Sequence, residues 1–200
     1  MIEINNEEES KIQQVPNAKS DILAFVWETI KVIIISLAII LPIRYYLVQP
    51  FFVKGASMEP NFEDGDYLLV DELSYHFHVP ERGDVVVFRY PVDTSQFFIK
   101  RIIGLPDETV EIKDNTVKIY NKNKPSGFVL NESYLAPEQR TLGNSVIKLD
   151  DNEYFVLGDN RIQSSDSRRW GSVNKSFITG RAFLRPWPFG KDIKIPSAEY

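Results

Sequence analysis

The sequence predicts a mainly β protein, in which a single N-terminal transmembrane helix is followed by one antiparallel, β-rich body. Residues 22–43 form a long apolar run, and from residue 49 onward short β-like segments alternate with turn residues. After residue 50, no segment repeats its apolar residues with the period of a long amphipathic helix. A chain of 200 residues, 43% of them hydrophobic, suits one globular domain with an added anchor.

The composition excludes several classes of function. The net charge of −5 gives no support to a nucleic-acid-binding surface. Cysteine is absent, which excludes disulfides, thiolate metal sites and a cysteine nucleophile. With two histidines, a metal site depends on carboxylates that no motif singles out, so we expect neither a metal nor an organic cofactor.

The N-terminal part is predicted to be a tail and an anchor. Residues 1–21 are polar and are predicted to be disordered. Residues 22–46 are predicted to be the anchor, since at about 1.5 Å per residue the apolar part matches the hydrocarbon core of a bilayer. Glu28 and Lys31 interrupt it near its start, at a spacing that lets them pair on one helix face. The Arg-Tyr-Tyr sequence at 44–46 is typical of a membrane interface.

Two other interpretations of the apolar run stay open on the sequence alone. It also fits a buried helix of a soluble protein, because the uninterrupted part, 32–43, is short for a membrane span. A cleaved signal peptide fits less well, because the preceding region is acidic and no small-residue cleavage site follows Arg44. Positive charges are nearly balanced on the two sides, so they do not fix the orientation.

Residues 47–190 are predicted to form the β-rich body. The sequence "ETVEIKDNTVKIYNKN" alternates on either side of Asp114-Asn115 and is predicted to be a hairpin. Residues 122–145 are polar and are predicted to be a loop-rich insertion, and residues 191–200 a C-terminal tail. The other strand-like segments are "DYLLVDEL", "GDVVVFRYP", "QFFIKRIIGLP", "EYFVLGDN" and "ITGRAFLRPWPF".

Ser57, in the short segment "VKGASMEP", is a candidate nucleophile. A serine in a turn is usually structural. Here Gly55 allows the backbone to approach a substrate closely, and Pro60 ends the segment sharply.

A serine nucleophile needs a base, and Lys100 is the better of two candidates. His76 and His78 alternate in "SYHFHVP", which predicts a strand with both rings on one side, facing solvent. Lys100 lies in the apolar run "QFFIKRIIG", where burial lowers a lysine pKa and makes the neutral amine a general base. The alternative is a lysine whose stem packs on the sheet while its amine reaches water. Arg101, on the opposite face, is predicted to be a surface or structural residue.

A polar segment, "VLGDNRIQSSDSRRWG" at 156–171, completes the candidate site. It contains serine hydroxyls together with Asp166 and Arg168. Such a loop is either simply solvated, or it holds hydroxyls that orient a neutral lysine while the two charged residues pair to stiffen it.

Three motifs, "GASMEP", "FIKRIIGLP" and "GDNRIQSSDSRRWG", follow the apolar run in this order. Together they resemble bacterial-type signal peptidase I, a family of membrane-bound Ser-Lys proteases. "GDYLLVDEL" and "RGDVVVFRYP" also match the pattern of that family. The resemblance covers most of the chain from the anchor to about Phe189, and it implies a catalytic domain of the signal-peptidase type.

The resemblance implies a role for each site residue. Ser57 is implied to be the nucleophile, with its backbone N–H donating to the oxyanion, and Lys100 the general base. Ser164 is implied to hydrogen-bond the lysine, and Asp166 and Arg168 to form a structural ion pair. The other residues of the implied site are the acidic Asp159 and the neighbours of the nucleophile, Gly55, Ala56, Met58 and Pro60.

The chain departs from the family pattern at three places. Gly55 stands where some members carry a serine whose hydroxyl completes the oxyanion hole, so a different second donor is expected. Ile162-Gln163 replaces Asp-Asn, and Asp107-Glu108 replaces Gly-Asp. None of these changes removes a member of the implied Ser-Lys pair.

By this resemblance the chain removes signal peptides from exported preproteins, cutting after small residues at −1 and −3 through an acyl-enzyme. The implied partners are preproteins, the lipid bilayer and the nearby protein-export machinery, with no nucleic acid. The implied location is the cell membrane, with a cytoplasmic N-terminus and an extracytoplasmic body. The alternatives are a self-cleaving transcriptional regulator, a membrane-tethered β module without activity, and a catalytically impaired relative.

Overall fold

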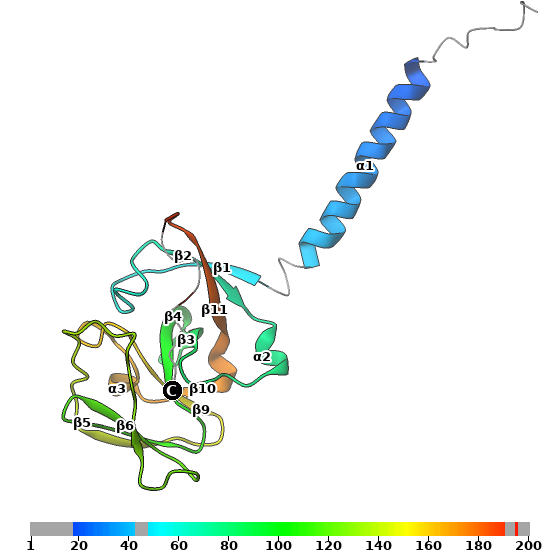
Figure 1. Ribbon diagram of the computed structural model, residues 1–200. Coiled ribbons are helices and arrows are strands. Elements are labelled where there is room, and N and C mark those ends of the chain that lie inside the picture. The colour runs from blue at the N-terminus through cyan, green and yellow to red at the C-terminus, as the bar shows by residue number, and fades with distance from the viewer. Residues whose placement is uncertain (1–17, 43–47, 191–194, 196–200) are drawn as a thin grey trace, which may run out of the picture. The chain divides into compact units, whose positions relative to one another are not determined.

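The computed structural model describes residues 18–42, 48–190 and 195 (Figure 1). The predicted N-terminal tail up to residue 17, and all of the predicted C-terminal tail except Ile195, lie outside the described residues. The chain divides into two compact units, 1–43 and 44–200.

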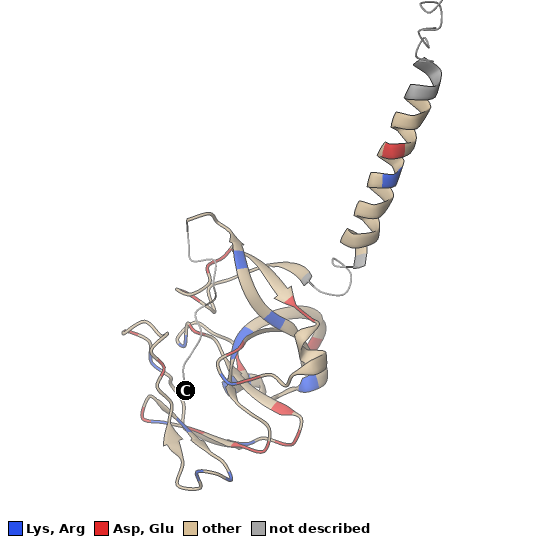
Figure 2. Ribbon diagram, turned by 45° about the vertical axis from the view of Figure 1, so that its right-hand side comes forward, with Lys and Arg blue, Asp and Glu red and all other residues tan. Residues whose placement is uncertain are grey.

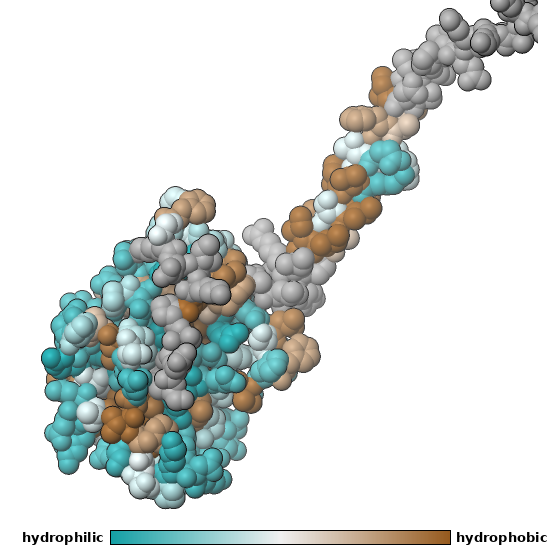
Figure 3. Space-filling model, in the orientation of Figure 1, coloured by the Kyte–Doolittle hydropathy of each residue, from teal (hydrophilic) through white to brown (hydrophobic). Residues whose placement is uncertain are grey.

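The first unit contains helix α1, Ala18–Pro42, so residues 18–21, which were predicted to belong to the disordered tail, are helical instead. Within the described residues, Ile22–Leu41 is the segment long and apolar enough to cross a membrane, with a mean hydropathy of 2.2 and no part buried. This exposure favours the anchor over the alternative of a buried helix in a soluble core. Lys31 Nζ donates to Glu28 Oε1 at 2.7 Å, which confirms the predicted pairing. Figure 2 shows the pair as adjacent red and blue bands, and Figure 3 shows apolar side chains over most of the remaining surface of α1.

The described strands of the second unit form two antiparallel sheets. The larger has the order β1 (Val48–Phe52), β2 (Tyr67–Asp71), β11 (Ile178–Trp187), β3 (Val85–Tyr90), β4 (Asp93–Gly104), β9 (Glu153–Leu157) and β10 (Val173–Asn174). The smaller has the order β7 (Phe128–Val129), β6 (Thr116–Tyr120), β5 (Thr109–Lys113) and β8 (Ser145–Lys148). Among its described residues this unit also has three short helical segments: α2 (Ser74–Phe77), α3 (Ser167–Trp170) and the 3-10 helix η2 (Lys175–Phe177). The predicted mainly β fold class is confirmed.

The hairpin β5–β6 forms as the alternation in its sequence predicts. Val110 pairs with Ile119 and Ile112 with Val117, so one face of both strands is buried. Asp114 and Asn115 both have positive φ values, 49° and 62°, as a tight hairpin turn requires.

Three clusters of buried apolar side chains hold the sheets together. One lies between the small sheet and the ends of β4 and β9 and includes Ile103, Val110 and Phe155. Another includes Met58, Phe62 and Leu68, and so fixes the loop between β1 and β2. The third lies on β3, β4 and β9 and includes Phe88 and Ile102. Because clusters cover both faces of the central strands, these strands read as nearly continuous apolar runs.

Two strand edges in the large sheet have no strand partner among the described residues. β1 is the first strand in the order and pairs only with β2. β4 pairs with β3 along Phe97–Arg101, but its pairing with β9 begins only at Arg101. On the side opposite β3, the residues of β4 up to Lys100 therefore have no neighbouring strand.

Candidate active site

Ser57 lies on the loop between β1 and β2, which we call the nucleophile loop. Backbone hydrogen bonds close this loop. Val53 N donates to Asp66 O, and Gly65 N donates to Val53 O, both at 2.9 Å. Gly55 has a φ of +83°, a conformation that favours glycine, and its N–H donates to Asp64 Oδ1 at 2.7 Å. On the other side of the serine, Met58 is fully buried in the core. The loop is thus fixed immediately before and after Ser57.

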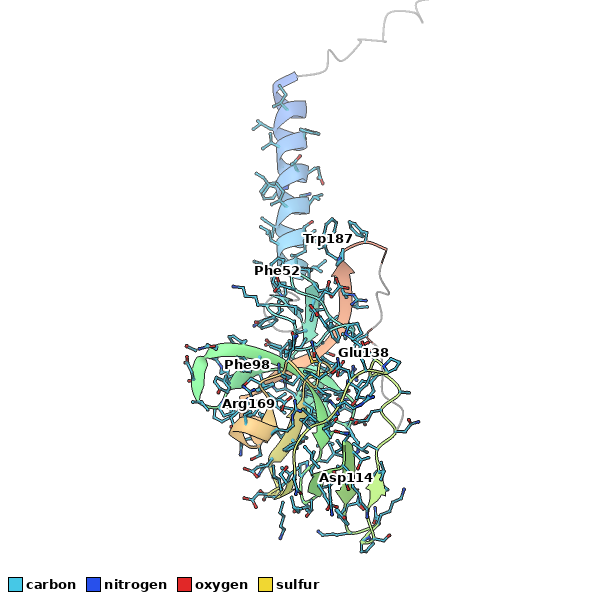
Figure 4. The ribbon with its side chains drawn as sticks, turned by 90° about the vertical axis from the view of Figure 1, so that its left-hand side faces the viewer. Phe52, Phe98, Asp114, Glu138, Arg169 and Trp187 are labelled. Carbon is cyan, nitrogen blue, oxygen red and sulfur yellow. The ribbon has the colours of Figure 1, made fainter. Side chains whose placement is uncertain are left out.

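Lys100 on β4 meets Ser57. Its Nζ lies 2.7 Å from Ser57 Oγ and 2.7 Å from the Ile99 carbonyl oxygen. The amine also lies 5.4 Å from the centroid of the Phe98 ring, which is labelled in Figure 4. The lysine is 3% exposed, so its amine does not reach bulk water and the snorkelling alternative is wrong.

Burial lowers the pKa of the Lys100 amine from 10.5 to about 8, because the charged form loses its hydration. The carboxylates of Asp166 and Asp159 act in the opposite direction and raise this pKa. The net result is an amine that is neutral in a substantial fraction of molecules near neutral pH, as a general base requires.

This pKa predicts the pH dependence of any reaction in which neutral Lys100 takes a proton. The neutral fraction rises from about 1% at pH 6 to about half at pH 8, so kcat/KM is expected to rise about fiftyfold over that range and then level off. A pH–rate profile of the full chain measures this directly. A midpoint near 10.5, the ordinary value for lysine, would contradict the prediction.

Arg101 and Asp159 form a buried ion pair beside this lysine. Arg101 donates from Nε to Asp159 Oδ1 at 2.9 Å and from Nη2 to Oδ2 at 2.7 Å, and both side chains are fully buried. The surface alternative for Arg101 is therefore wrong. Lys100 and Arg101 point to opposite faces of β4, but both faces are covered. The Arg101–Asp159 ion pair joins this strand to the 156–171 segment.

Asp166 and Arg168 pair as the sequence predicts. Arg168 donates from Nε to Asp166 Oδ1 and from Nη2 to Oδ2, both at 2.8 Å. Burial raises the pKa of the Asp166 carboxyl, but its hydrogen bonds and the Arg168 charge outweigh burial and hold that pKa below its ordinary value. Ser164 is buried nearby, and a hydrogen bond from its hydroxyl is one of the interactions that lower the pKa of Asp166. The hydrogen bonds of Lys100 Nζ join it to Ser57 Oγ and to the Ile99 carbonyl, so the bond to Ser164 that the resemblance implies stays a prediction.

Gly158 lies where the 156–171 segment crosses the nucleophile loop. A Cβ on this residue would overlap the Ser57 carbonyl oxygen and the Ser164 hydroxyl. Gly158→Ala is therefore expected to displace Ser57 and to lower kcat at least about a hundredfold, since a displacement of about 1 Å has that effect. Gly104→Ala is the matched control, because its Cβ would crowd Val110 and Leu149 in the apolar cluster beside the small sheet, not the nucleophile loop. The control is expected to lower the melting temperature with kcat of the folded enzyme retained; equal kcat values for the two variants would contradict the prediction.

A cavity of about 710 Å³ lies in front of the Ser57–Lys100 pair. One wall comes from the nucleophile loop, including Gly55 and Ala56, and another comes from β4. Gln163 from the 156–171 segment also lines it, so one departure from the family pattern faces the cavity. The remaining lining residues are Phe51, Phe52, Val53, Lys54, Leu68, Val87, Gln96, Phe97, Phe98, Ile99 and Ser165.

The structure adds residues that the sequence reasoning missed. Arg161 is buried and donates to the Glu132 carboxylate, to Thr141 Oγ1 and to Tyr134 Oη. The Arg101 guanidinium lies 4.2 Å from the centroid of the Tyr134 ring. Residues of the 122–145 stretch therefore support the site. The sequence carried no signal for this role, because it does not show which arginine the acidic and aromatic residues in "NESYL" meet.

The segment with the two histidines differs in part from its prediction. His76 and His78 are exposed, as predicted, but the strand expected there is wrong: Asp71 Oδ1 accepts from Ser74 N at 2.9 Å, and α2 forms instead.

Asp107 stands where the family pattern has glycine, and it keeps a φ of 64°, which aspartate tolerates better than most residues. Glu108 binds Arg82 through both carboxylate oxygens, at 2.7 and 2.8 Å.

Known proteins similar to this chain are signal peptidases. The family model described as "Signal peptidase, peptidase S26" matches residues 26–187. The chain is 38% identical to a probable signal peptidase I-1 of Synechocystis, over 82% of this chain and 84% of that protein, and 38% identical to a signal peptidase I of Bacillus amyloliquefaciens, over 82% and 86%. A crystal structure of an Enterococcus faecalis signal peptidase I aligns at 32% identity and a TM-score of 0.44, over 52% of this chain and 97% of that one. Because the family model matches most of the chain and these relatives match over most of their length, the chain belongs to the signal peptidase family, peptidase S26.

Proposed function

We propose that this signal peptidase cleaves signal peptides from exported preproteins with Ser57 as nucleophile and Lys100 as general base. The observation that carries the proposal is the 2.7 Å approach of Lys100 Nζ to Ser57 Oγ, at the edge of a cavity and with the lysine buried. The lowered lysine pKa fits the same role.

The reaction follows from the properties of the two groups. Neutral Lys100 has a lone pair that accepts the Ser57 hydroxyl proton as Oγ attacks the scissile carbonyl. The ammonium then gives this proton to the departing amine, which leaves as the N-terminus of the mature protein. A water molecule, deprotonated by the same lysine, attacks the acyl-enzyme ester; the bond to Ser57 Oγ breaks, Lys100 returns the proton to this oxygen, and the signal peptide is released. The Ile99 carbonyl accepts a hydrogen bond from Nζ and so orients the amine through both steps.

The free strand edges suggest how the substrate binds. Phe51–Val53 at the end of β1 and Gln96–Lys100 on β4 both line the cavity, and neither edge has a strand partner among the described residues. An extended peptide can therefore add to a sheet edge here, with its scissile bond at Ser57. Small residues at −1 and −3 are the substrate preference that family membership suggests.

Membrane attachment completes the proposal. We assign α1 as the single span, with the N-terminus in the cytoplasm and the body on the extracytoplasmic side, beside the lipid bilayer and the export machinery. Phe52 and Trp187 both pair with Tyr67 of β2, so exposed aromatic rings gather at one end of the sheet (Figure 4). Aromatic side chains favour the membrane interface, which suits a peptidase that cuts close to the bilayer.

Cleavage of a purified preprotein by the full chain in detergent or lipid tests this function. Mass spectrometry is expected to place the cut after an Ala-x-Ala sequence, and replacing both alanines with large residues is expected to abolish it. Ser57→Ala serves as the inactive control. If the wild type leaves several preproteins intact, the proposed function is overturned in favour of a non-catalytic or impaired protein.

A further inference from the structure

One residue of the 156–171 segment, Asn160, holds two successive carbonyl groups of the nucleophile loop. Its side-chain Nδ2 donates to the Ala56 carbonyl at 3.0 Å, which also accepts from Glu59 N at 3.2 Å, and its backbone N–H donates to the Ser57 carbonyl at 3.1 Å. Asn160 is buried, and its two partners are the carbonyl groups on either side of the Ser57 backbone N–H. Neither contact involves the Ser57 hydroxyl or the Lys100 amine.

Holding the Ala56 carbonyl also sets the direction of the Ser57 N–H. The peptide between the two residues is trans, and in a planar trans peptide the C=O and N–H point in opposite directions. With its carbonyl bound to Asn160, the peptide directs its N–H away from Asn160. Among the described residues, this N–H has no acceptor, and both Ala56 and Ser57 line the cavity. It is therefore available to an oxyanion formed in the cavity.

Asn160 is itself held in one orientation. Its Oδ1 accepts from Gln163 N at 3.2 Å, so Nδ2 is the atom that faces Ala56. The residues before and after it, Asp159 and Arg161, are anchored by buried ion pairs with Arg101 and Glu132. A rigid support of this kind is what an oxyanion donor needs, because its contribution depends on being aligned before the reaction.

We propose that Asn160 is the positioning residue for the oxyanion donor of this enzyme, acting by fixing the Ala56–Ser57 peptide. This role rests on the proposed Ser-Lys peptidase function. This positioning matters particularly in this chain, because Gly55 has no side-chain hydroxyl that could act as a second oxyanion donor. Stabilisation of the oxyanion therefore depends on how well the Ser57 N–H is aligned.

Asn160→Asp tests the proposal in the full chain in detergent. Aspartate keeps the shape and the Oδ1 acceptor for Gln163, but it replaces the donor to Ala56 with an oxygen that repels that carbonyl. We expect kcat to fall about a hundred- to a thousandfold with KM changed less than about threefold, as for the loss of an oxyanion donor. Asn174→Asp makes the same chemical change at the exposed cap of η2, where Asn174 Oδ1 accepts from Ser176 N, and is expected to leave both values unchanged.

Two peptide ligands separate positioning from a merely structural role. A peptide aldehyde that ends at the −1 residue forms a tetrahedral adduct with Ser57 and needs the oxyanion donor, whereas the same peptide with an amide end binds without an adduct. Asn160→Asp and Asn160→Ala are both expected to weaken the aldehyde by about a hundredfold and the amide by less than about threefold. Equal weakening of both ligands, or no change in either, overturns the positioning role while wild-type cleavage leaves the proposed function standing. An inactive wild type overturns both.

Discussion

Replacing Lys100 with methionine is expected to lower kcat/KM for preprotein cleavage by at least about a thousandfold. Methionine is one atom shorter than lysine and fills most of the apolar space of its stem, but it has no nitrogen lone pair to accept the Ser57 proton. Ser57→Ala is expected to cause a loss of the same size, and the double variant is expected to be no worse than either single one, because two residues that act as a unit are not additive. Initial rates on one preprotein, at a single pH near 8, provide the measurement.

The same variant has an opposite effect on stability, which separates lost chemistry from lost folding. Because the folded-state pKa is about 8 and the ordinary value is 10.5, folding penalises the protonated lysine. The penalty is present in full below pH 8 and disappears as the pH rises to 10.5. Lys100→Met is therefore expected to raise the melting temperature at pH 7 relative to the wild type. An inactive variant that is also less stable at pH 7 would indicate a damaged core, and an active one would exclude Lys100 as the base.

The fold was predictable where the residues within one short segment determine its structure. The β5–β6 hairpin is specified by alternating apolar residues and by an Asp-Asn turn. The segment with His76 failed because alternation over a few residues does not distinguish a strand from a helical turn, and the bonds from Ser74 to Asp71 decided the outcome. Strand order was not predictable, because β11 inserts between β2 and β3 through contacts distant in sequence.

The candidate site was predictable where a residue contradicts its surroundings. Lys100 is a charge in an apolar run, and the resulting expectation of burial is confirmed. Arg101 was harder, because the sequence does not show that both faces of β4 are covered, nor that Asp159 supplies its counter-charge. Asn160 and Glu132 carry no such signal, since polar residues in a polar loop are what solvent exposure also produces. Their roles depend on partners that only the folded chain brings together.

Removal of the Arg101 side-chain charge is expected to have the largest effect on stability. Arg101→Met leaves the Asp159 carboxylate fully buried without its cation, and breaking a buried pair in this way costs about 3–5 kcal/mol. Asn61 still donates to Asp159 Oδ2 at 2.8 Å, but a neutral amide does not replace the charge. The free energy of unfolding of the full chain in detergent, from a denaturant titration followed by tryptophan fluorescence, measures the effect.

An exposed pair in the same body provides the matched control for this prediction. Lys122 Nζ lies 3.9 Å from Asp107 Oδ2, with side chains 87% and 61% exposed, so Lys122→Met is expected to change the unfolding free energy by less than about 0.5 kcal/mol. Adding Asp159→Asn to Arg101→Met removes the unpaired charge and is expected to recover part of the lost stability. If Arg101→Met is as mild as Lys122→Met, the buried pair does not hold β4 to the 156–171 segment. The alignment of Lys100 with Ser57 must then come from the apolar core alone.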